Sequence, residues 1–98
     1  MRIKILTLEG ETERQNHMRR EFEKISTSPD FFYGVRGSAL SAKERRLAVI
    51  EPDILKPGEI GCALSHLQLY QYMIDEDIPY LMIVEDDVVF TPELVTLL

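Results

Sequence analysis

The chain has 98 residues, of which 45% are hydrophobic, and a formal net charge of -6 at pH 7. This length allows one domain with a small core, and the negative charge, without a Lys/Arg cluster longer than a pair, argues against nucleic acid as a partner. A single cysteine excludes an internal disulfide and a multi-cysteine metal site. The N-terminus lacks a signal-peptide core and no apolar run is long enough to cross a membrane, so we expect a cytoplasmic protein that could associate peripherally with the inner face of a membrane.

The first 25 residues predict a strand followed directly by a helix. Apolar residues dominate positions 3–8, and Gly10 marks the end of the strand. Thr12 and Gln15 have the spacing of a capping box, which predicts the start of the helix. The apolar stripe of this helix comprises Met18, Phe22 and Ile25, whereas His17 is expected to be solvated.

A second strand and a short helix are predicted next. The breaker-rich segment 26–30 precedes aromatic and β-branched residues at 31–35, which favour a strand. Ser41 and Glu44 form another capping box. The apolar residues expected to pack behind it are Leu47, Ala48 and Ile50.

The longest predicted helix runs from Pro57 to about Asp75 and is apolar on most of its circumference. One stripe comprises Ile60, Ala63, Leu64, Leu67, Tyr70 and Ile74, and a second comprises Cys62, Leu69, Tyr72 and Met73. Such a helix is buried on most sides, so we expect the first stripe to pack on a sheet and the second to lack its cover. Cys62 is predicted to be a small core residue, and Gly58 and Gly61 to allow close approach of another backbone.

The third predicted strand, residues 80–84, leads into three consecutive carboxylates, Glu85, Asp86 and Asp87. Thr91 and Pro92 then have the pattern of a helix start. Strands separated by helices predict an α/β fold with a three-stranded parallel sheet, in the order second, first, third, and flanking helices. Ligands of such sheets bind at the carboxyl ends of the strands, where these acids lie.

The three acids supply oxygen ligands, which suit Mg²⁺ or Mn²⁺ better than zinc. In an extended chain Glu85 and Asp87 share one face and Asp86 points the other way. The pattern therefore favours a site for a metal diphosphate. A solvated acidic turn is the structural alternative, and acidic pairs at strand ends also occur in receiver domains and phosphatases.

Two motifs in this order resemble glycosyltransferase family 25, which includes lipooligosaccharide and collagen galactosyltransferases. They are GEIGCALSH at 58–66 and IVEDDV at 83–88. The resemblance implies a partial GT-A-like (Rossmann-like) nucleotide-binding fold, with residues 1–98 as the N-terminal part of a truncated glycosyltransferase domain. It further implies metal-dependent, inverting transfer of a hexose, expected to be galactose, from a UDP-sugar to lipooligosaccharide or another glycan acceptor.

The resemblance also implies roles for particular residues. Glu85 and Asp87 would bind Mn²⁺ or Mg²⁺. The nucleotide would be bound by Leu8, Arg14, Glu85 and Asp86, although the segment 9–13 is more acidic than a diphosphate site favours. Ser65 and His66 would line the site, with packing within the helix as the alternative.

The general base and the acceptor site are expected beyond Leu98, so we predict that these 98 residues are inactive alone. We also expect them to self-associate through uncovered apolar surface. Two other functions remain open. One is a receiver-like signalling domain that binds Mg²⁺, which would place its acidic pair after the first strand. The other is a non-catalytic interaction domain.

Overall fold

The computed structural model describes residues 2–48 and 55–97 and contains a three-stranded parallel sheet. The strands are β1 (Ile3–Thr7), β2 (Phe31–Tyr33) and β3 (Met82–Glu85), in the order β2-β1-β3. The predicted α/β class and strand order are therefore confirmed. β1 and β3 pair in parallel with Ile3 beside Met82 and Leu6 beside Glu85, so their carboxyl ends meet at one edge.

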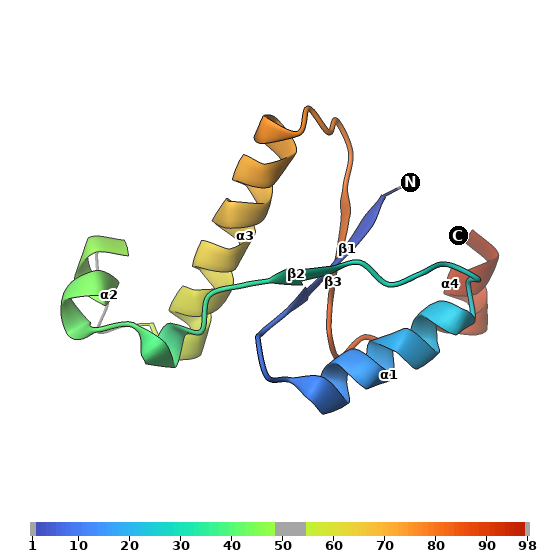
Figure 1. Cartoon of the computed structure of the whole chain (residues 1–98), viewed down its shortest axis with the longest axis horizontal. Helices are drawn as coiled ribbons and strands as arrows, with labels where there is room; N and C mark the ends of the chain where they lie inside the picture. Colours follow the sequence, from blue (N-terminus) through green and yellow to red (C-terminus); the bar gives the residue numbers. More distant parts are fainter. Residues whose placement is uncertain (1, 49–54, 98) are drawn as a thin grey trace. The chain divides into compact units, whose positions relative to one another are not determined.

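The helices are α1 (Thr12–Glu23), α2 (Ala42–Ala48), α3 (Pro57–Asp75) and α4 (Pro92–Leu97), with a 3₁₀ turn η1 at Gly37–Ala39 (Figure 1). No helix among the described residues has the length and apolar character needed to cross a bilayer. The chain divides into a first unit, made of the residues up to 32 and from 80 onward, and a second unit of residues 33–79. Each unit is described by itself below.

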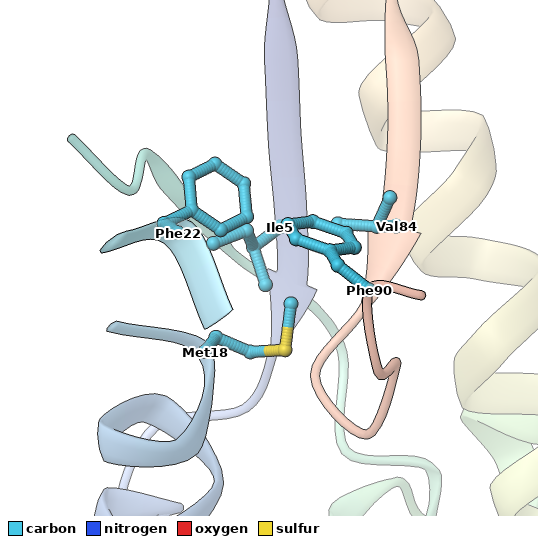
Figure 2. Packing of buried hydrophobic residues seen from close by; sticks show 5 residues of the cluster. All are labelled: Ile5, Met18, Phe22, Val84 and Phe90. Carbon is cyan, nitrogen blue, oxygen red and sulfur yellow. The ribbon is translucent and has the colours of Figure 1, made fainter. Parts of the chain in front are cut away.

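The core of the first unit lies between α1 and the paired strands β1 and β3. Figure 2 shows Met18 and Phe22 of α1 beside Ile5 of β1, with Val84 of β3 and Phe90 next to them. The rings of Phe22 and Phe90 are 5.3 Å apart between centroids. Ile25 packs against this cluster, so the predicted apolar stripe of α1 is confirmed.

The start of α1 differs from the predicted capping box. Thr12 lies inside the helix, the N-cap is Glu11, and no side chain caps it. Gly10 has φ +89° and the amide of Thr12 donates to the carbonyl of Gly10. Because this tight turn already binds the amide, the Gln15 side chain donates instead to the carbonyl of Leu8 at 3.1 Å.

The capping box of α2 is confirmed. The amide of Ser41 donates to the Glu44 carboxylate at 2.9 Å, and the amide of Glu44 donates to the Ser41 hydroxyl at 3.1 Å. Leu47, however, is 79% exposed, so the predicted packing behind the cap is wrong for this residue. The side chain of Ala48 and the whole of Ile50 lie outside the described residues.

α3 lies close to η1 at a glycine. A Cβ on Gly61 would lie 2.6 Å from the carbonyl oxygen of Val35 and from the amide nitrogen of Gly37, so only glycine permits this approach of α3 to η1. Gly58 has no such neighbour within 4 Å, and its predicted close approach is wrong. The helix starts at Pro57, as expected. The Glu59 carboxylate accepts a hydrogen bond from the Lys56 amide at 2.9 Å.

The exposed face of α3 is not the one predicted. The buried positions are Ile60, Gly61, Ser65 and Leu69. Leu69, expected to be uncovered, is fully buried, whereas Leu67 is 59% and Ile74 is 72% exposed. Cys62, predicted to be a core residue, is exposed as well.

The start of α4 agrees with the sequence pattern. The Thr91 hydroxyl accepts a hydrogen bond from the amide of Leu94 at 3.2 Å, as an N-cap does. Pro92 is the first residue of the helix. Leu94 and Val95 pack against the core of the first unit, so this short helix closes the end of the core.

Candidate functional site

The carboxyl edge of β1 and β3 brings Thr7 beside Asp86. Leu6 is the register partner of Glu85, so the residues that follow them are adjacent. The Thr7 hydroxyl donates to Oδ2 of Asp86 at 2.8 Å. Thr7 is 2% and Asp86 7% exposed. A buried carboxylate is stable only with such donors, and this hydrogen bond satisfies one of its oxygens.

Arg14 of α1 binds the other oxygen of Asp86. Its Nη1 donates to Oδ1 at 3.1 Å, and this contact raises the pKa of Arg14 above its ordinary value, first through the hydrogen bond and then through the charge of Asp86. The Arg14 side chain is 57% exposed. Asp86 therefore joins β3 to both β1 and α1, and each of its oxygens has a protein donor.

Glu85 and Asp87 are exposed on either side of buried Asp86, in agreement with the predicted alternation. The chain turns at Asp86 and Asp87, with the Val88 amide 3.4 Å from the carbonyl oxygen of Glu85. Over residues 2–48 and 55–97, no three His, Cys, Asp or Glu side chains gather into a metal site. Two exposed carboxylates nevertheless fit Mg²⁺ or Mn²⁺, because these ions commonly take one or two carboxylates together with phosphates and water.

His17 lies at this edge too, although it was expected to be solvated. It is half-buried, and its Nε2 is 2.9 Å from the carbonyl oxygen of Val88. Sequence reasoning missed both His17 and Thr7. His17 is three residues after Arg14 and so shares its face of α1, which was the available signal.

Leu8, predicted to contact the nucleotide, lies in the turn after β1. Its carbonyl accepts hydrogen bonds from the amide of Glu11 and from the side chain of Gln15. These bonds fix the backbone between β1 and α1 beside Thr7. A nucleotide contact by Leu8 stays a prediction.

Ser65 and His66, the predicted site-lining pair, make contacts inside the second unit. The buried Ser65 hydroxyl accepts from the Val35 amide at 2.8 Å and donates to the Gly61 carbonyl at 2.7 Å, so it binds backbone groups of its own unit. Nδ1 of His66 lies 2.9 Å from the Cys62 carbonyl oxygen. The packing alternative accounts for Ser65, whereas a role of His66 beside the acids stays a prediction.

Comparison with known proteins gives a match over the whole sequence. Residues 1–98 match the model of glycosyltransferase family 25, described as LPS biosynthesis protein. A glycosyltransferase 25 family member of Aedes aegypti is 33% identical over 92% of this chain and 16% of its own length. The lipooligosaccharide biosynthesis protein lic2B of Haemophilus influenzae is 32% identical over 86% of this chain and 32% of its own length.

Procollagen galactosyltransferase 2 of Homo sapiens is 29% identical over 90% of this chain and 16% of its own length. The chain thus spans between 16% and 32% of the relatives named here. The similarity nevertheless includes both sequence motifs and every strand of the sheet. On the strength of the match over all of its residues, the chain belongs to glycosyltransferase family 25.

Proposed function

We propose that this chain forms the nucleotide-sugar-binding part of a GT-A-like glycosyltransferase. The observation that carries the proposal is the pair of exposed carboxylates, Glu85 and Asp87, at the carboxyl edge of two parallel strands. Ligands of open α/β sheets bind at this edge. Family membership supports a sugar donor and a glycan acceptor as substrates.

The donor in this proposal is a UDP-hexose, with galactose as the sugar. The name of one relative, a procollagen galactosyltransferase, supports that choice. The names of the bacterial relatives support a lipooligosaccharide acceptor. Because such an acceptor is a membrane lipid, we place the activity at the cytoplasmic face of a membrane, with peripheral association.

Glu85 and Asp87 would hold Mn²⁺ or Mg²⁺ in this site. When bound, the ion would neutralise the diphosphate of the donor and act as a Lewis acid on the departing UDP. Arg14 would contact the diphosphate directly, because a guanidinium carries several N–H donors and the bond to Asp86 uses one of them. Asp86 would keep that guanidinium oriented toward the edge.

Transfer would proceed by attack of an acceptor hydroxyl on the anomeric carbon with inversion of configuration. His17, the histidine at this edge, already binds the Val88 carbonyl, and Glu85 and Asp87 are assigned to the metal in this proposal. We therefore assign the base and the acceptor site to the remainder of a longer protein. The 98 residues alone are expected to bind the nucleotide without transferring the sugar.

The test is calorimetric titration of the full-length protein with UDP in the presence and absence of Mn²⁺. Asp87→Ala is expected to weaken Mn²⁺-dependent UDP binding by about tenfold or more, since it removes one of two proposed metal ligands. Glu76→Ala removes the same charge from the end of α3 and should leave the affinity unchanged. Equal affinity in Asp87→Ala and the unmutated protein, with identical circular dichroism, would take the acidic pair out of the site.

A further inference from the structure

A row of polar side chains on α1 binds the segment that follows β3. The row comprises Arg14, His17, Glu21 and Lys24, which are three or four residues apart and share one face of the helix. Arg14 binds the side chain of Asp86 and His17 binds the carbonyl of Val88. Further along the helix, both Glu21 and Lys24 bind the backbone of Phe90. The row thus contacts every second residue of the segment, in order away from the acids.

The far end of this row is part of the core. The Glu21 carboxylate accepts from the Phe90 amide at 2.7 Å and from Lys24 at 2.9 Å, and the Phe90 ring packs on Phe22. Glu21 and Phe90 are both buried. Loss of Glu21 or Phe90 would therefore disturb folding as a whole, whereas the Lys24 side chain is 44% exposed.

The near end of the row, together with Thr7, binds the residues on both sides of Asp87. On one side, the Asp86 carboxylate is bound by Thr7 and Arg14. On the other side, the Val88 carbonyl is bound by His17 at 2.9 Å. Asp87 itself is exposed, so its carboxylate is presented to solvent from a backbone that is fixed before and after it.

We propose that His17 is a positioning residue for Asp87, which holds the backbone of this residue in place at the carboxyl edge of β3 for binding of a divalent cation. The inference rests on the proposed function and adds to it a residue outside the acidic motif. Nε2 of His17 would carry the proton that is donated to the Val88 carbonyl oxygen. Because the hydrogen bond from His17 already orders the turn at residues 86–88, binding of the cation does not have to order it. The affinity of the site for the cation is therefore higher than it would be if the turn were mobile.

The argument is specific to His17 among the members of the row. Its bond reaches the residue directly after Asp87, whereas those of Glu21 and Lys24 reach Phe90. His17 is also half-buried and absent from the buried core cluster, so its replacement should spare the fold. A purely structural histidine would affect stability without affecting the affinity for a cation.

The experiment compares three variants of the full-length protein. His17→Phe keeps a ring but lacks the donor, and His17→Gln offers an amide N–H at a similar reach. Lys24→Met is the matched control, because it removes a bond from the same helix to the same segment farther from the acids. Two quantities are measured: backbone hydrogen exchange of residues 86–90 without ligand, and calorimetric binding of UDP with MnCl₂.

We expect faster exchange at residues 87–89 and about tenfold weaker Mn²⁺-dependent UDP binding in His17→Phe, as for other residues that orient metal ligands. His17→Gln should restore most of both quantities, and Lys24→Met should leave the binding affinity unchanged. Unchanged exchange and affinity in His17→Phe would overturn the inference, as would equal loss of affinity in Lys24→Met. If the unmutated protein binds no UDP with Mn²⁺, the proposed function fails, and the exchange rates alone decide whether His17 fixes the backbone at Asp87.

Discussion

Replacement of Asp86 separates the two bonds that its buried carboxylate makes. Asp86→Asn keeps a carbonyl oxygen for the Thr7 hydroxyl but removes the charge that binds Arg14. A hydrogen bond to a charged group contributes about 1.5–3 kcal/mol. Because the Arg14 side chain is 57% exposed and can be hydrated instead, we expect a loss of only about 1 kcal/mol in the free energy of unfolding.

Asp86→Ala removes both acceptors. The Thr7 hydroxyl, in a residue that is only 2% exposed, would lose its partner, and a buried donor without a partner costs about 1–3 kcal/mol. Added to the loss at Arg14, the total should be about 2–4 kcal/mol. Thr7→Val in the Asp86→Ala background should recover part of this loss, because no unpaired hydroxyl then remains.

Urea unfolding at pH 7, followed by far-UV circular dichroism, measures these differences. The order of stability should be unmutated protein, Asp86→Asn, then Asp86→Ala. Equal stability of the Asn and Ala variants would show that the bond to Thr7 contributes nothing. A larger loss in Asp86→Asn than in Asp86→Ala would contradict the reasoning altogether, because it would mean that the Thr7 bond is unfavourable.

Two further predictions follow from Glu21 and from the exposed face of α3. The pKa of Glu21 is lowered, first by its hydrogen bond to Lys24 and then by the Phe90 amide. The charged form of Glu21 therefore stabilises the fold, fully so above the ordinary pKa of 4.5. This contribution is lost as the pH falls through the lowered pKa. The stability difference between the unmutated protein and Glu21→Gln should therefore shrink between pH 5 and pH 3 in urea titrations, and a constant difference would refute this. We also propose that the 98 residues self-associate through the exposed face of α3. The substitution Leu67→Glu should then lower the molecular mass measured by light scattering. A monomeric unmutated chain would exclude the association.

The sequence predicted the fold of the first unit well because its signals are local and mutually consistent. The apolar stripe of α1, the strand β3 and the N-cap Thr91 all occur as expected. The strand order followed from the alternation of strands and helices. These features depend on hydrophobic periodicity and helix capping, which are determined by residues close together in the sequence.

The orientation of α3 could not be predicted from its hydrophobicity. The helix has two apolar stripes, and the sequence analysis assigned the first to the interior and the second to the surface. The buried side of α3 includes Gly61, which lies against Val35 and Gly37, and Ser65, whose hydroxyl accepts a hydrogen bond from the Val35 amide. Hydrophobic patterning does not register a close backbone contact, so Leu67 was assigned to the interior and Leu69 to the surface.

The candidate site was predicted in its acids but not in the residues that support them. The alternation of Glu85, Asp86 and Asp87 was predicted from strand geometry and agrees with their burial, although β3 ends at Glu85 and the two aspartates lie in a turn. Thr7 and His17 were missed, because their importance depends on the strand register and on the path of the segment after β3, which are tertiary features.

Three adjacent carboxylates at the end of a buried strand pose an electrostatic problem, and the structure shows how two different environments reduce it. Asp86 is buried but has a donor for each oxygen and a cationic partner in Arg14. Its two neighbours, Glu85 and Asp87, are exposed to solvent, so their charges have no large desolvation cost. A divalent cation held by Glu85 and Asp87, as proposed above, would relieve the repulsion that remains between this exposed pair. The arrangement that makes the motif compatible with folding is therefore consistent with the proposed metal-diphosphate site.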